Sequence, residues 1–379
     1  MLWVEEMKKI SQETKILDDL DAIKKIDKNN MLSYCVEFSA HCEKAMQQAK
    51  KLSIKYPKPE NVIVAGMGGS AIGGEILKDW ARDRISVPIE VCREYSLPAY
   101  ADKNTLVFVV SYSGETEESL SIFLDAVTKK CKIVCISSGG TLHRFAEKLG
   151  ISQLHVPSGM APRATLPYLF IPLPMILEKI EVVSDVTSEV SEAIKVLKHI
   201  EELNSPEIPL KENFSKSLAV NIYGTVPIVY GFGIYRAVAQ RFKTQFNENS
   251  KVPAKWEFFP ELDHNEIVGW EAAKELAKCF SIILIRDKDE TEAMRQRIEV
   301  TKELMQQSLK VFEIQSVGNT VLAKILSTIC IGDFTSVYLA VMRGIDPTPV
   351  KSISFLKEKM KQSGEKEKII RELQKIAEK

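Results

Sequence analysis

The sequence predicts an α/β protein in which parallel strands alternate with helices. Runs rich in β-branched residues at 62–64, 105–110 and 132–136 are each followed by a segment whose apolar residues have helical spacing. Strands and helices that alternate in this way are typical of a parallel sheet with helices on both faces. The length of 379 residues is enough for two or three domains with cores of ordinary size.

The composition argues against several classes of function. The chain has 51 basic and 51 acidic residues and no basic run, so nucleic acid and a membrane surface are not expected as the main partner. No apolar run approaches about 20 residues, and the N-terminus lacks the layout of a signal peptide, so we expect a cytoplasmic protein. The 7 cysteines are scattered and there are 5 histidines, so we expect no disulfide framework, no metal and no cofactor.

The first half of the chain is expected to hold a helical lead-in and one sheet. Residues 1–57 have helical spacing, and a further strand is predicted at residues 87–91. Residues 157–174 hold five of the 16 prolines. This proline-rich segment predicts a long crossing loop and a domain boundary.

The second half repeats the opening pattern. Residues 178–202 are predicted to be helical, and residues 227–242 again have the pattern of a strand, a Gly-x-Gly turn and a helix, which indicates an internal duplication. The later predicted elements are strands at 281–285 and 310–314 and a helix at 321–342.

The C-terminal tail has apolar residues on one helical stripe, which predicts a helix that docks on the rest of the protein. We therefore predict an N-terminal domain at residues 1–175, a C-terminal domain at 176–357 and a helical extension at 358–379.

A glycine turn follows the first predicted strand. Gly66, Gly68 and Gly69 let the backbone approach a ligand closely, and the next helix directs free N–H groups and the positive end of its dipole at the same place. We interpret this turn as a phosphate site. The second half has Arg286 and Asp287 where the first has hydroxyl groups, so only the first half is expected to keep a working anion site.

A second loop, Ser111-Tyr-Ser-Gly-Glu-Thr116, follows the strand at 105–110 and places three hydroxyls at another helix start. The alternative is a dinucleotide site, because residues 66–71 also satisfy G-x-G-x-x-G/A and Glu90 lies about 20 residues further on. Glu90, however, lies inside an apolar triplet rather than at the end of its strand. Because three hydroxyls suit the oxygens of a terminal phosphate, we favour a phosphomonoester.

These loops resemble the sugar isomerase (SIS) domain. More narrowly, the chain from about Leu17 to Lys357 resembles the bifunctional phosphoglucose/phosphomannose isomerases of archaea and some bacteria. The resemblance implies an α/β fold of two SIS domains, each a doubly wound parallel sheet flanked by helices, related by internal duplication. The other matching segments are Ala161-Pro-Arg-Ala164, Phe246-Asn-Glu-Asn249, Pro260-Glu-Leu-Asp-His-Asn265 and Ile353-Ser-Phe-Leu-Lys357.

The resemblance also implies an activity and a set of site residues. The activity is the interconversion of glucose 6-phosphate, mannose 6-phosphate or both with fructose 6-phosphate through a cis-enediol, without a metal or cofactor. The substrate phosphate would be held by Gly68, Gly69, Ser70, Ser111, Ser113 and Thr116, and the chemistry would be carried by Arg163, Glu248, His264 and Lys357.

The chemistry of these four side chains suits such a reaction. Glu248, at the end of an amphipathic helix, is a candidate base for moving a proton between C1 and C2, and His264 is a candidate for ring opening, with its neighbours expected to fix its tautomer. Arg163 would stabilise the enediolate. Lys357 is expected to bury its stem while its ammonium reaches the sugar, with Lys351 as the competing lysine.

A non-catalytic sugar-phosphate sensor on the same fold is the alternative, because a fold does not decide a function. The presence of both Glu248 and His264 favours the enzyme. By resemblance to the wider phosphoglucose isomerases, His264 would come from a neighbouring subunit, so we expect a homodimer with composite active sites. The apolar residues 258–260 before it are interpreted as a loop at the subunit contact.

Overall fold

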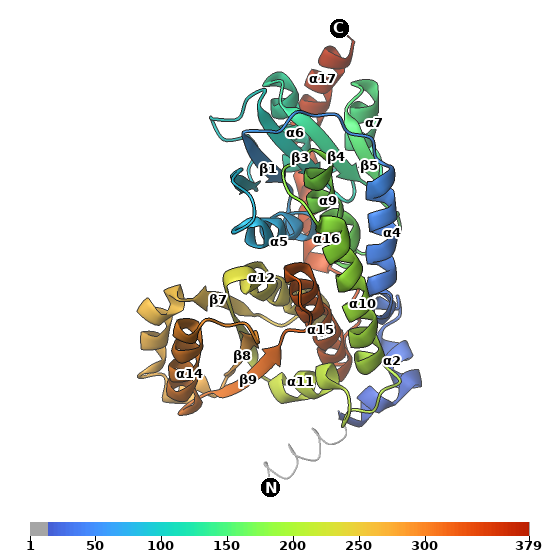
Figure 1. Ribbon diagram of the computed structural model, residues 1–379. Coiled ribbons are helices and arrows are strands. Elements are labelled where there is room, and N and C mark those ends of the chain that lie inside the picture. The colour runs from blue at the N-terminus through green and yellow to red at the C-terminus, as the bar shows by residue number, and fades with distance from the viewer. Residues whose placement is uncertain (1–13, 379) are drawn as a thin grey trace. The chain divides into compact units, whose positions relative to one another are not determined.

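The computed structural model describes residues 14–378 and contains two sheets in which all strands are parallel, as predicted (Figure 1). The first sheet has the strand order β2-β1-β3-β4-β5, and the second has the order β7-β6-β8-β9. In each sheet, the first strand in the chain lies between the second and the third: β1 lies between β2 and β3, and β6 lies between β7 and β8. This shared pattern agrees with the internal duplication.

The chain divides into two compact units. Among the described residues, the five-stranded unit comprises 40–191 and 350–378, and the four-stranded unit comprises 14–39 and 192–349. Both units are discontinuous in sequence, whereas the predicted segments 1–175, 176–357 and 358–379 are continuous. The difference arises because the described N-terminal helices pack on α15, in the unit with the second sheet.

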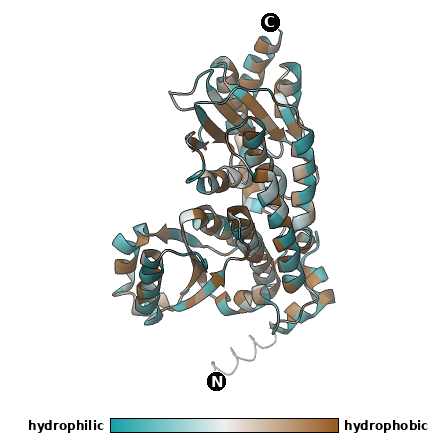
Figure 2. Ribbon diagram, in the orientation of Figure 1, coloured by the Kyte–Doolittle hydropathy of each residue, from teal (hydrophilic) through white to brown (hydrophobic). Residues whose placement is uncertain are grey.

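The core of the five-stranded unit forms around its central strands. All six residues of β3 are buried, and Figure 2 shows the strands of this sheet coloured mainly as hydrophobic. The strands are β1 Asn61–Ala65, β2 Ile89–Cys92, β3 Thr105–Val110, β4 Lys132–Ser137 and β5 Ser152–His155. The helices are α4 Phe38–Lys51, which begins in the other unit, η2 Gly68–Ser70, α5 Ile72–Ala81, α6 Glu117–Thr128, α7 Gly140–Lys148, η3 Pro162–Ala164, α8 Leu166–Phe170, α9 Pro172–Lys179, α16 Lys351–Met360, η8 Lys361–Ser363 and α17 Glu365–Ala377.

The prediction of a long loop at residues 157–174 is wrong. Most of this segment forms η3, α8 and the start of α9, and α8 is buried along its whole length. Each of these three helices has a proline at its first or second position. A proline there costs no hydrogen bond, because the N–H that it lacks has no partner inside the helix.

The C-terminal helix α17 docks as expected. Ile369 and Leu373 are 5% and 0% exposed and belong to the same hydrophobic cluster as Phe123 of α6 and Phe145 of α7. Figure 1 shows α17 beside the five-stranded sheet.

The four-stranded unit is built on α15, which has the length and apolar composition of a membrane-spanning helix. Its apolar window is, however, entirely buried inside the protein, as in the core helix of a globular unit. The strands are β6 Val226–Phe232, β7 Lys255–Phe259, β8 Phe280–Arg286 and β9 Lys310–Gln315. The helices are η1 Ile16–Asp18, α2 Leu20–Ile26, α3 Met31–Val36, α10 Val186–Asn204, which begins in the other unit, α11 Phe214–Ile222, η4 Gly233–Tyr235, α12 Arg236–Gln245, η5 Phe246–Ser250, η6 Glu261–His264, η7 Glu266–Trp270, α13 Lys274–Ala277, α14 Glu292–Gln306 and α15 Val321–Met342.

Candidate active site

The two predicted phosphate loops lie side by side at one edge of the five-stranded sheet. β1 and β3 are hydrogen-bonded neighbours, and the turn at Gly68–Ser70 and the loop at 111–116 follow their carboxyl ends. The backbone N–H of Tyr112 donates to the Ser70 hydroxyl at 3.3 Å, which links the two loops directly. Ligands of open parallel sheets bind at this edge, so the position agrees with an anion site.

The backbone of the turn is shaped by its glycines. Gly68 has φ +51°, in the left-handed region that favours glycine, and a Cβ at Gly66 would lie 2.9 Å from the carbonyl oxygen of Val110. Glu90, the residue weighed as a ribose ligand, is the second residue of β2 and accepts a hydrogen bond from Tyr100. It therefore does not lie at the strand end that a dinucleotide would reach.

The hydroxyl groups of the second loop gather around the start of α6. The Ser111 hydroxyl donates to the Thr116 hydroxyl at 3.1 Å, and Ser113, which is exposed, accepts from the backbone N–H of Glu115 at 3.2 Å. Thr116 is the N-cap residue of α6, but its side chain makes no cap hydrogen bond to the helix. The first N–H groups of this 12-residue helix are thus directed at the loop.

Arg163 lies directly behind the glycine turn. It is 3% exposed, so it is not a surface arginine. A Cβ at Gly69 would lie 3.1 Å from the Pro162 carbonyl oxygen and 3.3 Å from the Arg163 Cα, which means that η3 packs against the turn without room for a side chain. The backbone of a buried, permanently charged arginine thus packs against the first predicted phosphate loop.

The duplicated site in the four-stranded unit is filled by the chain's own side chains. Tyr235 ends η4 as Ser70 ends η2, and Asp287 follows β8 as Ser111 follows β3. The Tyr235 hydroxyl donates to Asp287 at 2.6 Å, and the Lys324 ammonium lies 3.0 Å from the same carboxylate. A carboxylate therefore lies at the position that corresponds to Ser111 in the five-stranded unit.

Glu248 lies in η5, one turn of π-helix that ends α12. Asn249 donates to the Ser336 hydroxyl at 2.9 Å, and the Ser250 hydroxyl donates to the Ser336 carbonyl at 2.6 Å, so the turn is anchored on α15. The Lys251 ammonium donates to the Glu248 carbonyl at 2.7 Å. Glu248 itself is half-buried. Turns of π-helix are rare in proteins, and many of those that occur lie at functional sites.

His264 ends η6 and is exposed. The expectation that its neighbours orient it is wrong. Asp263 accepts instead from Thr301 at 3.0 Å and pairs with Arg297 at 3.2 Å, while Asn265 donates to Glu261 at 2.9 Å. These contacts shape the loop that carries His264 without touching the imidazole ring.

Glu248 and His264 come before and after β7 in the chain. Glu248 precedes the amino end of this strand, and His264 follows its carboxyl end. A strand of five residues is roughly 17 Å long. Phe259, expected in a loop at a subunit contact, is instead the last residue of β7 and is 2% exposed in the core.

The environment of Lys357 differs from the expected one. It lies on α16 with an exposed side chain, as does Lys351 at the start of the same helix, so neither stem is buried within the unit. The phosphate loops and Arg163 are thus brought together in the five-stranded unit, whereas Lys357 does not pack into its core.

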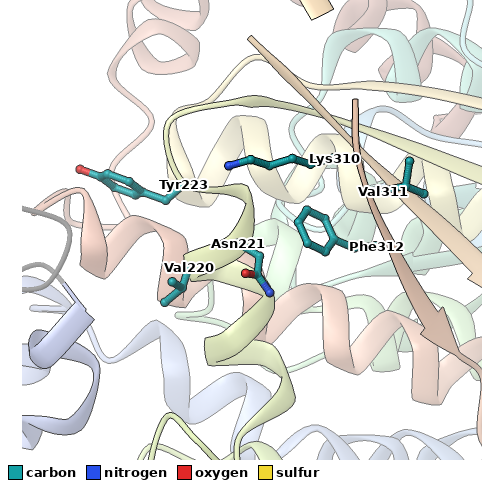
Figure 3. Close-up of a pocket in the computed structure, with 6 residues that line it drawn as sticks. All are labelled: Val220, Asn221, Tyr223, Lys310, Val311 and Phe312. Carbon is teal, nitrogen blue, oxygen red and sulfur yellow. The ribbon is translucent and has the colours of Figure 1, made fainter. Parts of the chain in front are cut away.

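The described part of the chain also contains a pocket of about 460 Å³ that sequence reasoning did not predict (Figure 3). It is lined by residues at the end of α11 and by the first residues of β9, among them Lys310. This is the amino edge of the second sheet, opposite to the edge where parallel sheets bind ligands. Within residues 14–378, no group of three or more His, Cys, Asp and Glu side chains is placed to hold a metal ion.

The comparisons with known proteins agree with this geometry. Residues 211–360 match the model of the bacterial phospho-glucose isomerase C-terminal SIS domain. A bifunctional phosphoglucose/phosphomannose isomerase of Caldicellulosiruptor bescii is 42% identical over 322 residues, which cover 84% of this chain and 95% of the relative. The enzyme of the same name from Aquifex aeolicus is 36% identical, and the match covers 80% of this chain and 91% of the relative.

The chain belongs to the bifunctional phosphoglucose/phosphomannose isomerase family. It is therefore an isomerase, as predicted. A crystal structure of a Thermus thermophilus protein has the same fold, with a TM-score of 0.72 at 16% identity, and the match covers 93% of this chain and 96% of that protein. The predicted pair of SIS domains is thus confirmed for a member of this family.

Proposed function

We propose that the protein interconverts fructose 6-phosphate with glucose 6-phosphate, mannose 6-phosphate or both through a cis-enediol. The observation that carries the proposal is the contact between Arg163 and the glycine turn. A purely structural turn does not require a buried arginine in the segment packed against it, whereas a site for a sugar phosphate uses both the N–H groups of the turn and a nearby positive charge.

The phosphate would bind at the two loops of the five-stranded unit. The backbone at Gly68 and Gly69, the hydroxyls of Ser70, Ser111, Ser113 and Thr116, and the start of α6 supply hydrogen bonds to its oxygens. Charge-assisted hydrogen bonds of this kind are about twice as strong as neutral ones. The phosphate would therefore fix the substrate while the other end of the sugar reacts.

The isomerisation itself is a proton transfer. Glu248 would remove the C2 proton of the open-chain aldose and return it to C1, while a proton passes between O2 and O1, so that the ketose forms without net loss of a proton. Arg163 would stabilise the negative oxygen of the enediolate intermediate. His264 and Lys357 would open the ring by moving a proton to and from the ring oxygen.

We further propose a homodimer in which His264 is supplied by the partner subunit. The order along the chain supports this arrangement, since Glu248 comes before the amino end of β7 and His264 after its carboxyl end, which are roughly 17 Å apart. The exposure of Lys357 is also in keeping with a site that a second chain completes.

A coupled assay with fructose, glucose and mannose 6-phosphates tests the proposal. Turnover of fructose 6-phosphate into either aldose is expected. A sugar-phosphate sensor would instead bind the three compounds without converting them, and this result would contradict the proposed activity.

A further inference from the structure

The first turn of the C-terminal helix α17 reaches the second phosphate loop. α17 begins at Glu365, after Gly364 with φ +70°, so Lys366 lies in its first turn. Ile369 and Leu373, one and two turns further on, are buried against α6 and α7 and fix the helix in this register. α17 is therefore held where Lys366 can contact the residues between β3 and α6.

Lys366 forms an ion pair with Glu115, the fifth residue of the loop Ser111-Tyr-Ser-Gly-Glu-Thr116. The Thr141 hydroxyl donates to the same carboxylate oxygen at 3.2 Å, and the backbone N–H of Thr141 donates to the other oxygen at 2.6 Å. Burial raises the pKa of Glu115, but the hydrogen bonds from Lys366 and Thr141 outweigh it and hold the pKa below the ordinary value. Glu115 is thus a charged carboxylate within an anion-binding loop.

Such a carboxylate opposes the binding of a phosphate unless its charge is compensated. Two like charges within one loop repel each other, and a phosphomonoester carries up to two negative charges near neutral pH. Lys366 supplies the compensating positive charge. Both side chains are partly exposed, at 31% and 40%, so the pair contributes little to the stability of the fold.

The same pair controls the backbone of the loop. Gly114 has φ +64°, its carbonyl accepts from Leu142 N at 2.9 Å, and a Cβ on it would lie 1.9 Å from the Gly139 carbonyl oxygen. The next residue, Glu115, bonds to Thr141 and Lys366 through its carboxylate. These bonds help to keep Gly114 close to Gly139. Ser113 and Thr116 flank Gly114 and Glu115, and the Ser113 hydroxyl accepts from the backbone N–H of Glu115 at 3.2 Å, which links the position of this hydroxyl to that of Glu115.

We propose that Lys366 is a positioning residue for the substrate phosphate, so that the C-terminal extension is a working part of the phosphate site. This inference rests on the assignment of residues 111–116 to phosphate binding under the proposed function. It adds that the extension sets the affinity of the loop by neutralising Glu115 and fixing the loop backbone.

Lys366→Met tests this proposal, with Lys368→Met as the matched control. Lys368 lies on the same helix but pairs with Glu365 at 2.8 Å rather than with a residue of the loop. We expect Lys366→Met to raise the KM for fructose 6-phosphate and the inhibition constant of inorganic phosphate roughly fivefold, the size of one charged contact, with kcat nearly unchanged. Lys366→Arg should restore most of the affinity, and Lys368→Met should leave both constants unchanged.

A double-mutant cycle with Glu115→Gln separates charge compensation from a general loss of folding. If Lys366 acts by neutralising Glu115, then Lys366→Met should cost less affinity in the Glu115→Gln background than in the wild type. Equal losses in the two backgrounds, or an inhibition constant for phosphate in Lys366→Met no higher than in Lys368→Met, would overturn the proposal.

Failure of the proposed function is recognised separately. Binding of inorganic phosphate and fructose 6-phosphate is measured by their protection against thermal unfolding, which needs no turnover. A wild type that binds both compounds without isomerising fructose 6-phosphate contradicts the isomerisation but still tests Lys366. A wild type that binds neither overturns both proposals.

Discussion

Arg241 and Asp333 form a buried ion pair in the four-stranded unit, with Nη2 and Oδ2 2.6 Å apart and side chains that are 2% and 7% exposed. The pair joins α12 to α15. The other carboxylate oxygen of Asp333 accepts from Arg241 Nε at 3.1 Å and from Gln245 at 2.9 Å. Because Gln245 directly precedes η5, this network fixes the end of the helix that carries Glu248.

Breaking this pair should destabilise the protein strongly. Asp333→Asn leaves the guanidinium of Arg241 buried without a negative partner, and we expect the free energy of unfolding to fall by about 3–5 kcal/mol. Urea unfolding measures this loss. Glu292→Gln, which removes the partner of an exposed pair with Arg295, is the control and should change the stability by no more than about 0.5 kcal/mol. Equal effects of the two substitutions would contradict the assigned role.

Glu248→Gln should abolish proton transfer while leaving substrate binding nearly intact. The amide keeps the shape of the side chain and loses its basicity, so kcat should fall roughly 100-fold or more at an almost constant KM. Glu303→Gln, at an exposed position of α14, is the control and should leave kcat unchanged. Solvent tritium that still enters C2 of the substrate at the wild-type rate in Glu248→Gln would show that another residue is the base.

The central strands were predictable because a strand buried on both faces is a continuous β-branched run. β3 was predicted with its observed bounds, since all of its residues are buried. β5 and β7 were missed, because these edge strands are only partly buried and carry polar residues such as Gln153 and Lys255. Their sequences do not differ clearly from those of loops.

Local environments at the site depend on contacts that are distant in sequence. The pairing of Lys366 with Glu115 joins residues 251 positions apart, and the π-turn at Glu248 depends on Ser336 of α15, so no local pattern predicts either. The prediction that the stem of Lys357 is buried is wrong for the same reason. Its helical spacing indicates one apolar side, yet Ile353, Phe355 and Leu356 are all exposed on α16.

Removing two hydroxyls from the second loop should weaken phosphate binding. Ser113→Ala with Thr116→Ala removes hydrogen bonds to the phosphate that contribute about 1.5–3 kcal/mol each, so the KM for every hexose 6-phosphate should rise, more than kcat changes. The matched control is Ser121→Ala with Thr128→Ala, which removes two hydroxyls of α6 that bond to backbone carbonyls away from the loop. A KM of the loop variant that equals that of the control would rule out the phosphate assignment for these hydroxyls.

Mixing two inactive variants should restore activity if the site is composite. Glu248→Gln and His264→Ala each lose one essential group, so neither homodimer has a complete site. A hybrid dimer contains one site that receives Glu248 from one chain and His264 from the other. With random exchange of subunits, half of the dimers are hybrids with one working site of two, which predicts roughly a quarter of the wild-type activity.

The control for this experiment is a mixture in which both chains carry Glu248→Gln, which should stay inactive after the same exchange of subunits. If both side chains acted from one chain, every site in the hybrid would lack one of them and mixing would restore nothing. Full activity of the wild type in a dilute and demonstrably monomeric sample would likewise contradict a composite site. Glu248 comes before the amino end of β7 and His264 after its carboxyl end, so restoration is the result that the proposed composite site predicts.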